Sequence, residues 1–153
     1  MEPHAPYSSF VVANEFIRLA QKNGGLTHMQ LQKLIYFAHV ESLRKYDKPL
    51  VKGVFQAWTY GPVDISVYLE FRGSGKEKIS EIKNVSDQID SNSKAIIKEV
   101  YDQYGHMPAW RLSEMTHKES SFFGSPWCSV YKEGESNPIP NEIIRNSFIV
   151  MRQ

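Results

Sequence analysis

The stretch Thr27-His28-Met29-Gln30-Leu31-Gln32-Lys33-Leu34-Ile35-Tyr36-Phe37-Ala38 decides the fold of this chain of 153 residues. Thr27 carries a hydroxyl suited to cap a helix. Apolar residues then fall on opposite faces of that helix, with Leu34 on one face and Val40 on the other. A helix that is apolar around most of its circumference is surrounded by protein. We therefore predict a central buried helix over about residues 28–46, ended by the Lys48-Pro49 step because the residue before proline avoids helical angles.

Weaker helical patterns flank this central helix on both sides. Helices are predicted to begin at Ser8 or Ser9, near Val63, at Ser91 or Ser93, after Pro108, and at Pro140. Short strands are predicted at 51–58 and 79–82, and 119–134 is expected to be irregular. Tyr60-Gly61-Pro62 is predicted to form a tight corner, with Pro62 in the first turn of the next helix. The predicted fold class is mainly α, a single compact multi-helix domain over residues 8–151 with a few short β-strands.

Composition restricts the class of protein. The net charge is +1, without the basic excess typical of nucleic-acid binders, so DNA or RNA is an unexpected partner. One cysteine, Cys128, excludes an internal disulfide. Neither a signal peptide nor an apolar run of roughly 18 residues is present, which predicts a soluble protein of the cytoplasm.

The sequence has no recognisable catalytic or metal-binding motif. None of its five histidines has a zinc-type spacing, so no metal and no cofactor are predicted. Gly73-Ser74-Gly75-Lys76 follows a predicted helix, whereas a phosphate loop precedes one, so this segment is interpreted as a turn. An enzyme is therefore not expected.

Two polar side chains have a functional and a structural interpretation. His117 could act as a general base oriented by Glu119, but Thr116 and His117 are more simply interpreted as closing a helix. Lys33 lies on the predicted central helix among apolar neighbours. We expect it to pair with a carboxylate, with Glu15, Glu70 and Glu119 as candidates, rather than to act as a reactive amine.

Three ordered blocks resemble a known family. They are Leu31–Ala38, Ala57–Val63 with Val67-Tyr68 and Phe71, and Trp110-Arg111-Leu112-Ser113-Glu114-Met115-Thr116-His117. Together they are similar to the Panacea domain, also called the SocA-like antitoxin domain. The resemblance extends from about Val12 to Phe148.

The resemblance implies an antitoxin of a bacterial or phage toxin–antitoxin system. Such a protein neutralises a cognate toxin, typically encoded by the adjacent gene, through direct protein–protein binding. Two other functions stay open: a proteolytic adaptor that delivers the toxin to a protease, and an enzyme that reverses the toxin's effect.

Candidate site residues fall into two groups, neither of them catalytic. Exposed aromatic side chains are the usual anchors of protein interfaces. The predicted partner-binding residues are Trp58, Tyr60, Phe122, Phe123 and Trp127. The residues that carry the family resemblance are interpreted as structural: Gln32, Lys33, Tyr36, Gly61, Pro62, Thr116 and His117.

Overall fold

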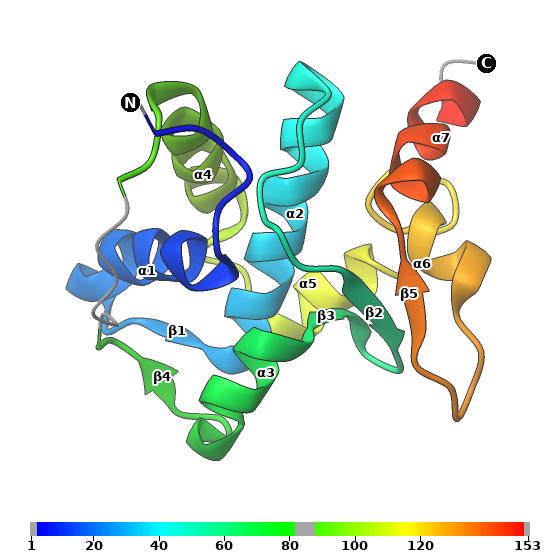
Figure 1. The fold of residues 1–153 in the computed structure, drawn as a ribbon. Helices are drawn as coiled ribbons and strands as arrows, with labels where there is room; N and C mark the ends of the chain where they lie inside the picture. The colour runs from blue at the N-terminus through cyan, green and yellow to red at the C-terminus, as the bar shows by residue number, and fades with distance from the viewer. Residues whose placement is uncertain (1–2, 82–87, 152–153) are drawn as a thin grey trace.

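Helix α2 (His28–Tyr46) runs through the middle of the computed structural model, which describes residues 3–81 and 88–151 (Figure 1). Its N-terminus carries a capping box: the Thr27 hydroxyl accepts from the Gln30 backbone N–H at 3.2 Å, and the Gln30 side chain accepts from the Thr27 N–H at 2.9 Å. The helix ends at Asp47, whose backbone is left-handed with φ 54°. Contacts with α1, α3, α4, α5 and α7 bury most of its surface, so the prediction of a central buried helix is confirmed.

The other elements surround α2 and confirm the mainly α class. The remaining helices are α1 (Ser9–Ala20), α3 (Ile65–Phe71), α4 (Ser91–Tyr104), α5 (Ala109–Met115), α6 (Ser125–Val130) and α7 (Asn141–Met151). The strands are β1 (Leu26–Thr27), β2 (Phe55–Trp58), β3 (Gly61–Asp64), β4 (Lys78–Ile79) and β5 (Asn137–Ile139). In Figure 1, α1 and α4 lie on one side of α2, and β5, α6 and α7 lie on the other.

Short antiparallel strands make two small sheets. β1 pairs with β4, and β2 lies between β3 and β5. The predicted strand at 79–82 is observed only as β4, and Ile82 lies outside the described residues. The predicted strand at 51–58 is confirmed for its second half, where β2 and β3 form a hairpin around the turn Thr59–Tyr60.

Two local predictions are wrong. Pro62 lies in strand β3, not in the first turn of a helix, and α3 begins only at Ile65. An edge strand tolerates proline because one side of it needs no backbone N–H, and β3 is at the edge of its sheet. The segment 119–134 is not wholly irregular either, since it contains α6 with Pro126 near its start, a position that proline favours.

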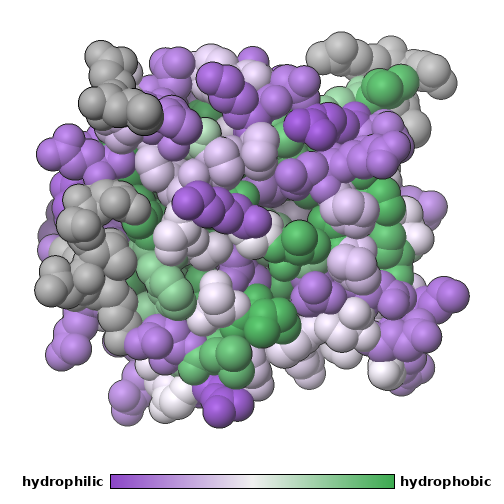
Figure 2. All heavy atoms as spheres, viewed as in Figure 1, coloured by the Kyte–Doolittle hydropathy of each residue, from purple (hydrophilic) through white to green (hydrophobic). Residues whose placement is uncertain are grey.

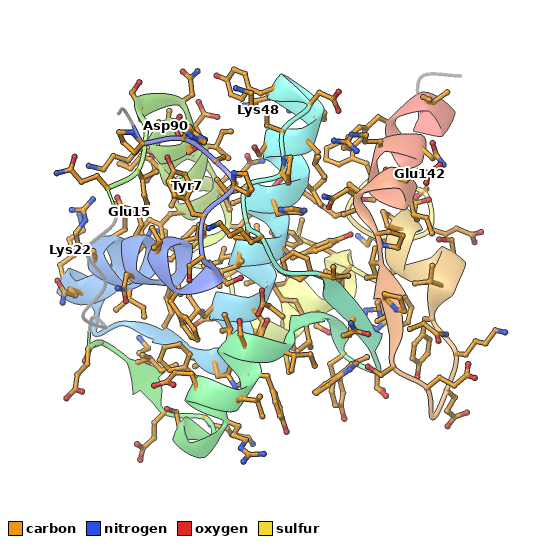
Figure 3. All side chains as sticks on the ribbon, viewed as in Figure 1. Tyr7, Glu15, Lys22, Lys48, Asp90 and Glu142 are labelled. Carbon is orange, nitrogen blue, oxygen red and sulfur yellow. The ribbon has the colours of Figure 1, made fainter. Side chains whose placement is uncertain are left out.

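The chain before α1 is tied to the start of α4 (Figure 3). The Tyr7 hydroxyl donates to the Asp90 carboxylate and accepts from the Asp90 backbone N–H at 2.8 Å. Asp90 also caps α4 by accepting from the Ser93 N–H at 3.1 Å. These bonds lower the pKa of Asp90 in spite of its partial burial. Two segments distant in sequence are thereby held together.

A buried histidine links α2 to both flanking parts of the fold. The Nδ1 atom of His39 accepts from the backbone N–H groups of Leu50 at 3.2 Å and Val51 at 3.3 Å. Nε2 therefore carries the proton and donates to the side chain of Asn141, at the start of α7, at 2.8 Å. Burial lowers the pKa of His39 to about 4, and the bond to Asn141 only partly opposes this effect.

We expect the protein to lose stability in mild acid because of His39. Its pKa is about 4 when folded and 6.5 when unfolded, so below pH 6.5 the unfolded chain binds more protons. The free energy of unfolding should fall by up to about 3 kcal/mol between pH 6.5 and pH 4. Urea unfolding at a series of pH values measures this change. His39→Gln should flatten the profile, whereas substitution of the exposed His106 by Gln should leave it unchanged.

Candidate functional site

The β2–β3 hairpin is held in place through its backbone carbonyls. Four of them, between Trp58 and Pro62, accept hydrogen bonds from side chains of other segments. The donors are Trp127 Nε1 to Trp58 O at 2.7 Å, His117 Nε2 to Thr59 O at 2.8 Å, Ser113 Oγ to Tyr60 O at 2.6 Å, and Lys33 Nζ to Pro62 O at 2.9 Å. The donors come from α2, α5, the residues after α5, and α6. We call this arrangement the braced hairpin, residues 55–64.

Lys33 is the most deeply buried of these donors, with 0% of its surface exposed. No carboxylate of the described residues lies within ion-pair distance of its Nζ atom, and Glu15 pairs with Arg18 instead. The predicted ion pair is therefore wrong. Burial lowers the pKa of Lys33 to about 7, because the charged ammonium is poorly solvated in the protein interior. A lysine with this pKa is partly neutral at physiological pH.

Gly61 makes room for this packing. Its φ of +118° is unfavourable for residues with a side chain. A Cβ atom at this position would lie 2.4 Å from Thr116 Oγ1 and 2.9 Å from Lys33 Cε. Thr116 is itself fully buried, and its hydroxyl donates to the Ser113 carbonyl at 2.6 Å. The hairpin can approach α2 and the end of α5 only because residue 61 has no side chain.

His117 bridges α5 and the turn of the hairpin. Its Nδ1 atom lies 2.6 Å from the Ser113 carbonyl oxygen, and its Nε2 atom lies 2.8 Å from the Thr59 carbonyl oxygen. Both ring nitrogens are therefore engaged with backbone carbonyl oxygens. Neither nitrogen is left to accept a proton from a substrate, and no contact between Glu119 and His117 is found among the described residues. The geometry does not support a general base at this position.

Gln32 fixes the far end of the hairpin. Its Oε1 atom accepts from the Asp64 backbone N–H at 2.8 Å, and its Nε2 atom donates to the Asp64 carbonyl at 3.0 Å. The Asp64 carboxylate caps α3 by accepting from the Val67 N–H at 3.2 Å. Gln32 thus joins α2 to the junction between β3 and α3.

The braced hairpin exposes aromatic side chains beside a pocket. Tyr60, in the turn, has 66% of its surface exposed. Trp58 is half-buried; its ring lies edge-on to Tyr68 at 4.8 Å, and its Nε1 atom donates to Ser136 Oγ at 2.8 Å. The pocket has a volume of about 310 Å³. It is lined by His28, Met29, Gln32, Trp58, Tyr60, Val63, Tyr68 and Gly75.

Apolar side chains continue outside the pocket. Figure 2 shows hydrophobic residues gathered in the lower centre of this face, over α3 and the neighbouring strands. Leu69 of α3 and Val54, just before β2, are exposed at 56% and 52%. On α5, Trp110 is exposed at 67%, one turn before the Ser113 that contacts the hairpin. The region around the hairpin therefore combines aromatic and aliphatic surface.

The other aromatic candidates, Phe122, Phe123 and Trp127, do not line this pocket. Phe123 is buried and stacks on Phe37 with ring centroids 4.3 Å apart. Trp127 is also buried, packed between His117 and Tyr131. Phe122 is half-buried under the guanidinium of Arg44, 5.5 Å from its ring centroid, towards the C-terminal end of α2. The structure thus brings Trp58 and Tyr60 together and places Phe122 in a different pocket.

The remaining motif residue, Tyr36, belongs to the core. It has 0% exposure and lies edge-on to Phe55 of the hairpin at 5.0 Å. Its hydroxyl has no hydrogen-bond partner within the described part of the chain, and burial raises its pKa. Three further residues belong to the site and are not predicted from the sequence: Ser113, His28 and Tyr68. Only Ser113 could have been recognised from a sequence signal as part of the site through its position between Trp110 and His117, in a block that carries the family resemblance.

Within residues 3–81 and 88–151, no cluster of His, Cys, Asp and Glu side chains has an arrangement that could hold a metal ion. None of the helices over residues 3–81 and 88–151 has the length and apolar character required to span a bilayer.

The fold and the site define a mainly α-helical domain built around a central helix and a braced hairpin. The chain belongs to the antitoxin SocA-like, Panacea domain family, whose profile matches residues 31–121. It is similar to Antitoxin SocA of Caulobacter vibrioides (strain NA1000 / CB15N), with 34% identity over 113 residues. That alignment covers 67% of this chain and 58% of the relative, so the chain spans little more than half of the relative's length. No solved structure matches the chain.

Proposed function

We propose that this protein is an antitoxin that neutralises a cognate protein toxin by direct, stoichiometric binding, and that the braced hairpin is the centre of the binding surface. Family membership and the name of the Caulobacter relative support an antitoxin role. The observation that carries the assignment of the surface is the exposure of Tyr60 on a backbone whose carbonyls are individually held.

A fixed turn is well suited to binding. Association is opposed by the loss of conformational freedom at the interface, and a turn that is already ordered loses less. Tyrosine and tryptophan also contribute disproportionately to interface energies when they become desolvated. Tyr60 and Trp58 combine both properties. In this proposal, Trp127 and Phe123 support the surface without contacting the toxin. Trp127 donates a hydrogen bond to the Trp58 carbonyl, and Phe123 stacks on Phe37 in the core.

The other parts of the proposal follow from the family. Residues 8–151 form one antitoxin domain, and the toxin is encoded by the adjacent gene. The two proteins meet in the cytoplasm, and neutralisation requires no turnover by this chain.

Tyr60→Ala should weaken toxin binding by about ten- to one hundredfold, because the exposed ring is lost from the centre of the interface. Calorimetric titration of the purified product of the adjacent gene measures the affinity. Growth of cells that express both proteins measures neutralisation. The unfolding midpoint should change little, since the Tyr60 side chain is mostly exposed.

Tyr46→Ala is the matched control. Tyr46 is also an exposed tyrosine, at 45%, but it lies at the opposite end of α2 from the pocket. The Tyr46→Ala variant should bind and neutralise the toxin as the wild-type protein does. Equal binding by Tyr60→Ala and the wild type would contradict the assignment of the surface. Rescue of growth without any complex would contradict direct binding itself.

A further inference from the structure

His28 lines the pocket beside the hairpin and carries a hydrogen-bond donor whose position on the ring is set by its neighbours. Since Gln32 Oε1 must accept from the Asp64 N–H, the amide group of Gln32 has only one orientation. Its Nε2 atom, which carries the hydrogens, also lies 3.2 Å from His28 Nε2. An N–H group can bond there only if His28 Nε2 presents its lone pair. The proton of the neutral ring is therefore on Nδ1.

Protonation of both nitrogens is unfavourable in this setting. A second proton on His28 Nε2 would point at the Gln32 amino group. Partial burial lowers the pKa of His28, and the positive charge of Lys33 lowers it further. The ring is packed against Tyr68 and Phe71, with centroids 5.7 and 6.4 Å away. His28 Nδ1–H is thus a neutral donor in a fixed ring, and no acceptor for it is found among the described residues.

The remaining lining residues restrict the group that could bind. Met29, Val63 and the three aromatic rings provide apolar walls. Among the residues that the structure describes, the lining includes no carboxylate, lysine or arginine. The positive end of α2 lies nearby, so a cation would be repelled and an acceptor oxygen favoured. The volume of about 310 Å³ is at the lower limit of the roughly 300–1,000 Å³ of small-molecule sites, which suits a single inserted side chain.

The geometry points to this pocket as the acceptor site for a glutamine or glutamate side chain of the toxin, with its methylene stem between Trp58, Tyr60 and Tyr68 and its carbonyl or carboxylate oxygen at His28 Nδ1. The assignment depends on the toxin binding proposed above. It extends that proposal by naming the type of toxin side chain that occupies the pocket.

The first test needs no toxin. In a long-range ¹H–¹⁵N spectrum of the histidine rings at pH 7.5, His28 should have a protonated Nδ1 and an unprotonated Nε2. Gln32→Leu removes the amide that selects this form, so its spectrum should show a mixture of both tautomers. A protonated Nε2 in the wild type would overturn the assignment.

The second test measures affinity for the product of the adjacent gene. His28→Phe keeps an aromatic ring against Tyr68 and Phe71 but removes the donor, and it should weaken binding about tenfold. His106→Phe, which makes the same replacement at an exposed histidine outside the pocket lining, is the matched control and should bind like the wild type. Unfolding midpoints of both variants establish that they are folded.

A double-mutant cycle identifies the inserted residue. Each surface glutamine and glutamate of the toxin is replaced by methionine and combined with His28→Phe. One of them should show coupling, so that the two substitutions together weaken binding at least threefold less than the product of their separate effects. Wild-type affinity in His28→Phe, or coupling with none of the toxin's residues, would overturn the pocket assignment while leaving the antitoxin proposal intact. Failure of the wild-type protein to bind the toxin would overturn both.

Discussion

Gly61→Ala is expected to destabilise the protein by about 3 kcal/mol or more. Two effects act together at this position: φ is +118°, and a methyl group would overlap Thr116 Oγ1 at 2.4 Å. Neither Thr116 nor Lys33 can move away easily, because both are fully buried and hydrogen-bonded to backbone carbonyls. The loss is a large part of the roughly 5–15 kcal/mol by which domains are stable. Chemical unfolding of the purified variant gives the free energy directly.

Gly73→Ala provides the control for this substitution. Gly73 has no positive φ, and a Cβ atom there would have no neighbour within 4 Å. Its replacement should change the free energy of unfolding by less than about 0.5 kcal/mol. An unfolding curve for Gly61→Ala that coincides with that of Gly73→Ala would show that the hairpin can shift without loss, contrary to the bracing described above.

The largest pH effect is expected from Lys33. Its pKa is about 7 in the folded protein and 10.5 in the unfolded chain, so between these values the unfolded state binds more protons. The free energy of unfolding should therefore rise with pH from about 7 towards 10, by up to roughly 4 kcal/mol. Below pH 7 the charged ammonium is buried with no carboxylate partner in the described part of the chain, and this stabilisation is absent. Denaturant unfolding at intervals between pH 6.5 and 9.5 measures the slope.

Two lysine variants separate this effect from general titration. Lys33→Met keeps the approximate shape but removes the ionisable group, and should abolish most of the rise with pH. Lys98→Met removes a lysine whose side chain is 57% exposed and paired with Asp102, and should keep the rise. A wild-type profile without slope between pH 7 and pH 9.5 would contradict the lowered pKa of Lys33.

Much of the fold could be predicted because its central element has a strong local signal. The apolar faces of α2, the capping threonine just before it and the Lys48-Pro49 step just after it define this helix from local sequence alone. The secondary-structure predictions fail where tertiary contacts decide which structure a segment adopts. Pro62 belongs to a strand because β2 pairs with it, and β5 was not predicted because its three residues, Asn137–Ile139, become a strand only beside β2. α6 is too short for its periodicity to be recognised.

The site was harder to predict than the fold. Exposed Tyr60 and half-buried Trp58 were candidates on the basis of residue type alone. Nothing in a linear sequence shows that Lys33 donates to a carbonyl instead of pairing with an acid, because that contact joins residues 29 positions apart. The orientation of His28 depends on Gln32, whose amide is itself oriented by Asp64. Indirect effects of this kind can be recognised only in the three-dimensional structure.

The turn of the hairpin is specified by parts of the chain outside it. The carbonyl oxygens of residues 58, 59, 60 and 62 accept hydrogen bonds from Trp127, His117, Ser113 and Lys33, respectively. Every amino acid supplies a backbone carbonyl, whatever its side chain. The backbone path is therefore independent of which side chain stands at position 60. Such a scaffold is a starting point for retargeting by directed evolution: libraries randomised at Thr59 and Tyr60 would vary the recognition chemistry while the supporting framework stays constant, as in an antibody loop.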